Sequence, residues 1–319
     1  MVRQTLSILD PTSLLGREVV SGLAIELPDV HCRLFHTTGA DEHLIAEIGG
    51  EAGVVAPLHS LDELAGSAAV IVSRTLDEEL AAALLDWLTR HPEVALVDAS
   101  QPGIAGEKAL TVLDGAPRRR GQPRWYHLLD PSLAAPVRLL QALASLGPTG
   151  ALVTVFRSAS GFGGAAVEEL AVQAAARLTG LAPASPCFLP AVLAFDLAPA
   201  DDAAHAFLER QFAGVVPGLD LELRAVETGV FFGHAASFFV SLAEATTERR
   251  VRSALRDGGL RLARRNQSVR PSDLVDHDIA TCAQLRVTGK RVSGWLVADG
   301  LRLAGAAAVV RIATDAMAF

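Results

Sequence analysis

The stretch TLSILDPTSLLGREVV, residues 5–20, decides how the chain begins to fold. The apolar run Leu6–Leu9 has strand character, and a helical pattern starts after a short turn. A dinucleotide-binding fold places its glycine-rich phosphate loop at such a turn. Because Gly16 is the only glycine in the stretch, the residues predict a strand, a turn and a helix, but a phosphate loop that lacks most of its glycines.

The first 100 residues continue this alternation of strands and helices. A strand, a helix and a strand at this spacing build a parallel sheet. The predicted strands cover residues 5–9, 31–38, 66–74 and 93–100, and the predicted helices cover about 14–26 and 76–91. We therefore expect an N-terminal α/β domain around a parallel sheet.

The regular alternation of strands and helices ends at the Pro- and Gly-rich stretch 101–123, which places a domain boundary near residues 125–130. Long extended runs then alternate less regularly with helices, which indicates helices packed on a mostly antiparallel or mixed sheet. The extended runs cover 149–160, 220–244 and 283–299, the helices cover about 132–146, 164–179 and 202–213, and an Ala-rich helix follows residue 300. The second domain is therefore expected to be α+β.

The chain has 319 residues and a formal net charge of −8, which argue for two domains and against a general nucleic-acid-binding surface. Two basic clusters break the acidic trend, at residues 117–124 and 248–265. The first is expected to form a solvated loop, and the second one or two helices with a charged outer face. A role in binding an anion or a phosphate is the alternative for each cluster.

The sequence does not indicate a membrane protein, a disulfide framework or a zinc site. Every long apolar stretch is interrupted by a charge, Pro or Gly before it is long enough to span a bilayer. The N-terminal residues lack the features of a signal peptide, so we expect a cytoplasmic protein. The cysteines Cys32, Cys187 and Cys282 lie far apart and form no CxxC pair.

Six motifs follow one another along nearly the whole chain. They are DPTSLLGREV (10–19), ALVDAS (95–100), SASGFGGAAVEEL (158–170), LAFDLAP (193–199), VFFGHAASFFVSL (230–242) and WLVADGLRL (295–303). In this order and spacing they resemble the aspartate-β-semialdehyde dehydrogenase superfamily, particularly its divergent Usg-like branch.

The resemblance implies a Rossmann-type, NAD(P)-binding-like domain over residues 1–128, completed by residues 300–319, whose helix returns to it. Residues 129–299 would form the catalytic and dimerisation-like domain. The family's chemistry is the reductive dephosphorylation of an acyl phosphate. A cysteine thiolate forms a thiohemiacetal and an acyl-enzyme, a histidine moves protons, and two further side chains hold the substrate.

Two of the implied catalytic positions carry other residues. Ser132 stands where the family has its nucleophilic cysteine, and a serine hydroxyl is not ionised near neutral pH as a low-pKa thiol is. The other interpretation is that Asp130 or Ser132 caps a helix. Arg157 stands where the family has a substrate-orienting glutamine. It can grip a carboxylate or phosphate, or it can form a structural ion pair.

His234 matches the family's proton-transfer histidine, in the stretch VFFGHAAS. Glu227, seven residues earlier, replaces the substrate-binding arginine, and an anion at that place repels an anionic substrate. The phosphate-binding arginine expected after VDAS is also absent, since that region offers Lys108 and, further on, Arg118–Arg120. His234 is therefore either a catalyst or a hydrogen-bonded, half-buried histidine.

The cofactor positions show the same pattern of replacement. Asp10 and Ser13 stand at the first two glycines of the family's GxxGxxG loop, and Gly16 keeps the third, which packs the helix against the strand. Ala308 stands where the family aims an asparagine at the nicotinamide. The cofactor-binding positions that the resemblance implies are Asp10, Thr12, Ser13, Gly16, Gly161 and Gly163. We expect no cofactor, or NADP if binding is retained.

Three functions are compatible with these residues. The first is a catalytically degenerate aspartate-semialdehyde dehydrogenase-like protein, retained as a homodimer or as a partner or regulator of an active relative. The second is an active NAD(P)-dependent oxidoreductase acting on a semialdehyde or acyl phosphate, with Arg157 as an anion clamp and Thr12, Ser13 and Gly16 accommodating the dinucleotide. The third is a hydrolase built from Ser132 and His234, which needs the hydroxyl within about 3.2 Å of the imidazole and an orienting acid.

Overall fold

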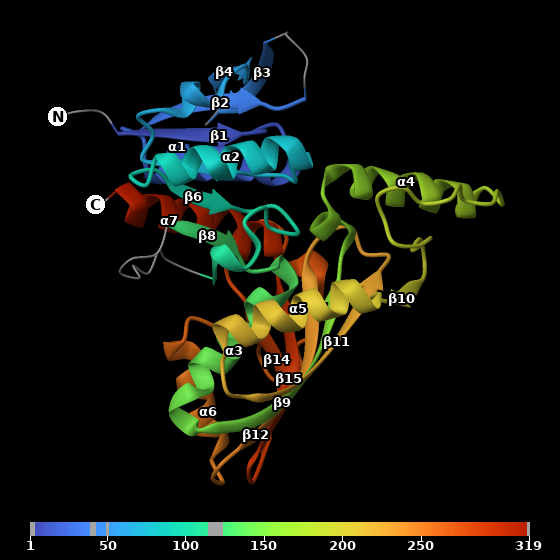
Figure 1. Ribbon diagram of the computed structural model, residues 1–319. Coiled ribbons are helices and arrows are strands. Elements are labelled where there is room, and N and C mark those ends of the chain that lie inside the picture. Colours follow the sequence, from blue (N-terminus) through green and yellow to red (C-terminus); the bar gives the residue numbers. More distant parts are fainter. Residues whose placement is uncertain (1–3, 39–42, 49–50, 114–123, 318–319) are drawn as a thin grey trace. The chain divides into compact units, whose positions relative to one another are not determined.

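Figure 1 shows the computed structural model, which describes residues 4–38, 43–48, 51–113 and 124–317. The chain forms two compact units. Unit 1 consists of Met1–Leu129 and Ala304–Phe319, and unit 2 of Asp130–Leu303. Among the described residues, no helix is both long and apolar enough to cross a membrane.

Unit 1 is built on an eight-stranded sheet in the order β3-β4-β2-β1-β5-β6-β8-β7. All neighbouring strands are parallel except β3 and β4, which confirms the predicted parallel sheet. The strands are β1 (Thr5–Leu9), β2 (His31–His36), β3 (Leu44–Ile48), β4 (Glu51–Pro57), β5 (Ala69–Val72), β6 (Ala95–Asp98), β7 (Leu110–Val112) and β8 (Trp125–Leu128). The strands β3, β4, β7 and β8 are additional to those that the sequence predicts.

Two apolar layers cover the two faces of this sheet. Unit 1 contains the α-helices α1 (Leu14–Glu26), α2 (Glu78–Arg90) and α7 (Ala307–Met317), and the short 3-10 helices η1 (Leu61–Leu64) and η2 (Gly106–Lys108). Leu6 and Ile8 of β1 belong to the apolar cluster that contains residues of α1 and α7, whereas Leu9 packs with Trp87 of α2. The C-terminal helix thus returns to the first unit, as predicted.

Unit 2 contains a seven-stranded mixed sheet in the order β10-β11-β9-β12-β15-β14-β13. The pairs β9-β11 and β13-β14 are parallel and the other neighbours are antiparallel, so the predicted mixed sheet is confirmed. The strands are β9 (Pro148–Arg157), β10 (Leu197–Pro199), β11 (Asp220–Thr228), β12 (His234–Leu242), β13 (Arg261–Leu262), β14 (Thr281–Thr288) and β15 (Arg291–Ala298).

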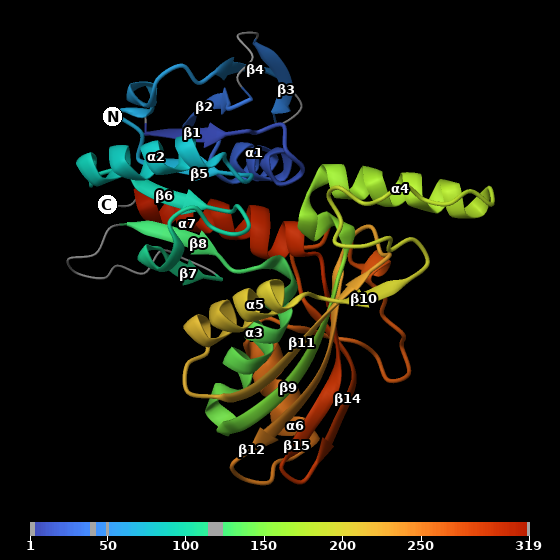
Figure 2. The ribbon, with the colours of Figure 1, turned by 45° about the vertical axis from the view of Figure 1, so that its right-hand side comes forward.

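The helices of unit 2 agree with the predicted ones within a few residues. They are α3 (Ala134–Leu143), α4 (Gly164–Leu178), α5 (Asp202–Val215) and α6 (Glu248–Asp257), with the short 3-10 helices η3 (Pro131–Leu133), η4 (Ala144–Leu146), η5 (Ala159–Phe162) and η6 (Pro271–Asp273). A π-helical turn, η7 (Leu301–Ala306), precedes α7. In both views α4 projects beyond the edge of the unit 2 sheet, on the side of β10 (Figure 2).

Three segments differ from the sequence prediction. The extended run 283–299 is divided into β14 and β15 by a turn in which Gly289 has a φ of 60°. The extended run 220–244 is divided into β11 and β12 by a turn in which Gly233 has a φ of 78°. The basic segment 248–265 is helical only to Asp257 and continues as β13, because the chain turns at Gly258 and at Gly259, which has a φ of 79°. The other basic cluster, 117–124, lies outside the described residues except for Arg124.

Candidate functional site

Three ionisable side chains lie close together at the ends of three neighbouring strands of the unit 2 sheet, β11, β9 and β12. Arg157 ends β9 and pairs with Glu227 of the parallel strand β11. The strand β12 runs antiparallel to β9 and begins at His234, next to the pair formed by Ala235 and Phe156. The ends of two parallel strands and the start of an antiparallel one therefore lie side by side.

Arg157 joins two carboxylates, and we refer to Asp130, Arg157 and Glu227 as the buried ion cluster. Nη1 of Arg157 donates to Glu227 Oε1 at 2.8 Å, and Nη2 donates to Asp130 Oδ2 at 3.3 Å. All three residues are buried, and the guanidinium also lies 4.8 Å from the ring centroid of Phe162. Of the two roles considered for Arg157, the structure contains the ion pair.

The buried ion cluster holds two carboxylates and one guanidinium, so its charges do not cancel. Burial alone would raise the pKa of Asp130, but the charge of Arg157 and hydrogen bonds from Ser132 outweigh it and hold this pKa below its ordinary value. Glu227 lacks such additional donors, so burial prevails over the attraction of Arg157 and raises its pKa. Glu227 Oε2 and Arg157 Nε have no hydrogen-bond partner among the described residues.

Ser132 lies beside Asp130 in the turn that leads into α3. Asp130 is the N-cap of η3, and its Oδ1 accepts from the backbone N–H of Ser132 at 2.9 Å and from the Ser132 hydroxyl at 2.5 Å. The capping interpretation is therefore correct for Asp130. The hydroxyl thus donates to a carboxylate whose pKa is lowered, and such a carboxylate is a weak base.

His234 is buried and its imidazole is neutral at pH 7. Burial lowers its pKa to about 4; the charge of Asp130 opposes this shift and the charge of Arg157 adds to it. Nδ1 accepts from the backbone N–H of Ser158 at 3.1 Å. Since a backbone amide only donates, the ring proton is on Nε2. Within the described residues no hydrogen bond joins His234 to Ser132, the contact that the hydrolase hypothesis requires.

Glycines make room for the ring of His234. A Cβ at Gly300 would lie 2.6 Å from His234 Cδ2, and one at Gly161 would lie 3.2 Å from Cε1. Gly163 has a φ of 96° and precedes α4 as its N-cap residue. The glycines of the SGFG stretch therefore have structural reasons of their own, a steric one for Gly161 and a conformational one for Gly163.

The turn after β1 holds another buried carboxylate, that of Asp10. Its Oδ1 accepts from the backbone N–H of Thr37 at 2.9 Å, its Oδ2 accepts from the Thr37 hydroxyl at 2.6 Å, and Arg74 Nε is 3.5 Å from Oδ2. Asp10 has a φ of 55°, which Asp tolerates better than most residues. We refer to Asp10, Thr37 and Arg74 as the first-loop cluster.

The other cofactor positions of unit 1 are occupied by packing and capping contacts. Ser13 Oγ accepts from the Gly16 N–H at 2.9 Å and caps α1. A Cβ at Gly16 would lie 2.6 Å from the carbonyl oxygen of Asp10, which explains this glycine by close packing. Thr12 is exposed, and Ala308 is fully buried in the apolar cluster of α1 and α7.

These contacts do not fit a dinucleotide pyrophosphate. A phosphate-binding helix start offers unpaired backbone N–H groups, and one of those in the first turn of α1, the Gly16 amide, is already bonded to Ser13. The carboxylate of Asp10 places a negative charge where the pyrophosphate would bring more. Within the described residues, no group of three or more His, Cys, Asp or Glu side chains is arranged to hold a metal ion either.

No family profile matches the sequence, and no curated protein sequence matches it. Solved structures do match. Aspartate semialdehyde dehydrogenase II from Vibrio cholerae, complexed with ASA, matches at a TM-score of 0.83 and 20% identity over 100% of this chain and 97% of that one. A probable aspartate-semialdehyde dehydrogenase from Pseudomonas aeruginosa matches at 0.82 and 20% over 97% and 96% of the two chains. The Candida albicans enzyme, solved with NADP, matches at 0.70 and 11% over 99% and 98%.

This chain has the aspartate-semialdehyde dehydrogenase fold. The fold that the six motifs imply is thereby confirmed.

Within this dehydrogenase fold, sequence reasoning misses part of the site. It assigns Asp130 at most a capping role, although Asp130 also pairs with Arg157. It does not find Gln211 of α5, whose Oε1 accepts from the backbone N–H of Asp130 at 2.6 Å. Asp130 had a local signal, its position directly before Pro131. Gln211 had none, because it lies 81 residues from its partner.

Proposed function

We propose that this chain is a catalytically degenerate member of the aspartate-semialdehyde dehydrogenase superfamily, in which the fold is retained and the chemistry is lost. The observation that carries the proposal is the pairing of Arg157 with the chain's own Asp130 and Glu227. The resemblance assigns the positions of Arg157 and Glu227 to the substrate. In this chain the carboxylates that pair with the cation Arg157 are side chains of the protein itself.

The neighbouring residues support the same proposal. The Ser132 hydroxyl donates a hydrogen bond to Asp130, whose lowered pKa makes it a poor proton acceptor. The Nδ1 lone pair of His234 is taken by the Ser158 amide. The other ring nitrogen, Nε2, carries the proton of the neutral ring. It can therefore donate a hydrogen bond but has no lone pair with which to accept a proton. These residues position one another, and none is poised to attack a carbonyl group or to remove a proton.

The turn after β1 supports the loss of the cofactor. The superfamily's fold is compatible with NADP, as the Candida albicans structure illustrates. In this chain Asp10 is engaged by Thr37 and Ser13 by Gly16. We infer that NADP does not bind, and the proposal contains no hydride-transfer step.

Exposed apolar side chains on one segment of unit 2 support a role in association, either between two copies of this chain or with an active relative. These side chains, on and after α4, are Val172, Leu178, Leu181, Phe188, Phe195 and Leu197. Leu178 is 77% and Phe195 71% exposed. Glu169 accepts from three backbone amides of 187–189, and Gln173 accepts from those of Leu193 and Ala194. The segment is held in shape while its apolar side chains face outward, which is typical of an interaction surface.

A titration with NADPH tests the proposal directly. A ligand that binds the folded state raises the melting temperature. The wild-type chain is therefore expected to show no such rise at millimolar NADPH. It is also expected to show no phosphate-dependent turnover of a semialdehyde. The double variant Asp10→Gly with Ser13→Gly is the matched comparison, because it restores the two glycines and removes the charge. NADPH binding by the wild type together with turnover would overturn the proposal in favour of an active oxidoreductase. Light scattering on the same sample reports the oligomeric state.

A further inference from the structure

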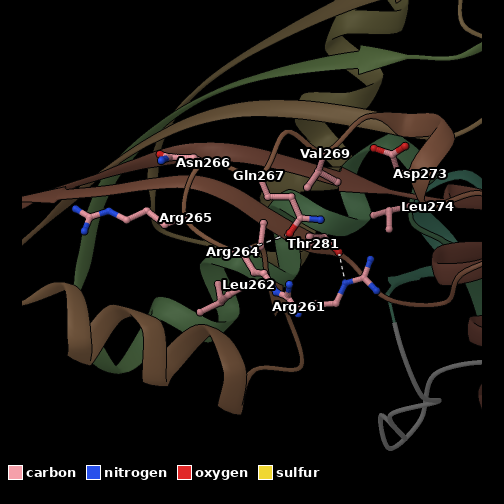
Figure 3. Close-up of a pocket in the computed structure, with 11 residues that line it drawn as sticks. Arg261, Leu262, Arg264, Arg265, Asn266, Gln267, Val269, Asp273, Leu274 and Thr281 are labelled. Atoms are coloured by element: carbon pink, nitrogen blue, oxygen red, sulfur yellow. Dashed lines mark hydrogen bonds between the residues drawn. The ribbon is translucent and has the colours of Figure 1, made fainter.

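A cavity of about 690 Å³ lies in unit 2, outside the buried ion cluster, where β13 leaves the sheet and η6 and β14 follow (Figure 3). Its wall includes residues 261–267, Val269, Asp273, Leu274 and Thr281. The volume falls within the range of small-molecule sites. Arg261, Arg264 and Arg265 of its wall belong to the second basic cluster of the sequence, residues 248–265. Anion binding is the alternative function that the sequence suggests for this cluster.

The wall of this cavity is positively charged. Arg261, Arg264 and Arg265 contribute three guanidinium groups, and no ion pair engages them within the described residues. The carboxylate of Asp273 is the acidic group of the wall, and it is already paired with Arg270, with Nη2 and Oδ1 2.9 Å apart. The excess of cations stands out against a net charge of −8 for the chain.

The three arginines are exposed, and the fold fixes the guanidinium of Arg261 and the backbone turn that carries Arg264. Arg261 Nε donates at 3.0 Å to the hydroxyl of Thr281, a buried residue. The turn from Arg264 to Gln267 is closed by a backbone hydrogen bond of 3.0 Å, and Gln267 Oε1 accepts from the Arg264 N–H at 3.1 Å. Figure 3 shows Arg261 and Arg264 near Thr281, with the side chain of Arg265 pointing away from them.

We infer that this cavity binds a small molecule that carries a multivalent oxyanion of the phosphate-ester type. A guanidinium group offers planar pairs of donors that match phosphate oxygens, and charge-assisted bonds of this kind are the strong ones. A cavity of this size accommodates a small molecule, and the net charge of −8 argues against the extended backbone of a nucleic acid. The inference goes beyond the proposed function and does not depend on it, since none of its residues belongs to the buried ion cluster or to the first-loop cluster.

Calorimetric titration of the full chain tests the inference, with inorganic pyrophosphate and ADP as probes in about 0.15 M salt, which screens exposed charges. Saturable binding is expected, and Arg261→Ala and Arg264→Ala are each expected to weaken it at least about tenfold. Arg249→Ala is the matched control, because Arg249 is exposed on α6 and does not line the cavity. It should change affinity less than about twofold. Binding of pyrophosphate alone would identify the inorganic ion, and tighter binding of ADP an organic phosphate.

Unchanged melting temperatures of the unliganded variants show that they are folded. Arg264→Lys, which keeps the charge but not the fork of donors, is expected to lose part of the affinity. Three results would overturn the inference: no saturable binding of either probe, an equal loss of affinity in Arg249→Ala, or binding of a single-stranded oligonucleotide without binding of pyrophosphate.

Discussion

The buried ion cluster of unit 2 and the first-loop cluster of unit 1 both hold a buried carboxylate at a position that the resemblance assigns to a ligand, but they hold it differently. Asp10 receives two hydrogen bonds from a neutral residue, Thr37. The cation near it, Arg74, has a side chain that is 49% exposed. Glu227 depends on Arg157, whose side chain is 8% exposed and is shared with Asp130.

The difference determines how much each cluster should contribute to stability. Water solvates an exposed cation when its partner is removed, so breaking such a pair costs little. Water does not reach a cation enclosed between two buried carboxylates, and its removal leaves uncompensated buried charge. We therefore expect substitutions in the buried ion cluster to lower the free energy of unfolding more than substitutions in the first-loop cluster. The stability that the buried ion cluster contributes should also depend more strongly on pH.

Arg157→Leu is expected to have the largest effect. It removes the cation from between Asp130 and Glu227 and should lower the free energy of unfolding by about 3–5 kcal/mol. Urea unfolding at pH 7 measures this. The double variant Arg157→Leu with Glu227→Leu should recover part of the loss, because one of the two orphaned carboxylates is removed as well.

Arg224→Leu provides the matched control for this variant. Arg224 lies on β11 and pairs with Glu222, but both side chains are more than half exposed. The expected cost is below about 1 kcal/mol. Equal costs for Arg157→Leu and Arg224→Leu would mean that burial does not distinguish the two ion pairs.

The pH dependence of stability should carry two opposite contributions from unit 2. The pKa of His234 falls from the ordinary 6.5 to about 4 in the folded chain. The unfolded chain therefore binds more protons between these values, and folding should weaken by up to about 3 kcal/mol as the pH falls from 7 to 4. The raised pKa of Glu227 acts in the opposite sense. Its contribution is present at acidic pH and is lost as the pH rises through the folded pKa.

Urea unfolding between pH 4 and 7 separates the two contributions. His234→Gln keeps an acceptor for the Ser158 amide and should flatten the loss of stability toward pH 4. Glu227→Gln should steepen it, because the opposing contribution is removed. Parallel curves for the wild type and both variants would exclude a role of these groups in the pH dependence.

Most of the fold is predictable from the sequence because it rests on local patterns. The alternation from Thr5 to Asp98 specifies the parallel sheet of unit 1, and the apolar periodicity of α2 specifies its buried face. The strands β3 and β4 escape prediction because, among those of their side chains that the structure describes, only Val55 and Pro57 are buried. The division of 220–244 escapes prediction because apolar residues continue on both sides of the turn that contains Gly233, which has a φ of 78°.

The candidate site is less predictable, since its contacts are long-range. The motifs locate Arg157, Glu227 and His234 individually, and the substitution of Arg and Glu at two substrate positions indicates a changed site. Only the parallel register of β9 and β11, 70 residues apart in sequence, shows that these two side chains pair. Asp10 similarly suggests repulsion of a phosphate, whereas its bonds to Thr37 follow from the packing of β1 beside β2.

Within the two clusters, the smallest of the expected effects concerns Asp10. Asp10→Ala removes both acceptors of Thr37 and places Ala at a φ of 55°, where a residue other than Gly, Asn or Asp is strained. Thr37 is only half-buried, so water can satisfy part of its bonding, and we expect a loss of about 1–2 kcal/mol in urea unfolding. Asp10→Asn keeps an acceptor and tolerates this backbone conformation, so it should cost less. If Asp10→Ala cost as much as Arg157→Leu, the first-loop cluster would be as essential to the folded state as the buried ion cluster, and the contrast between an exposed and an enclosed cation would not govern stability in this chain.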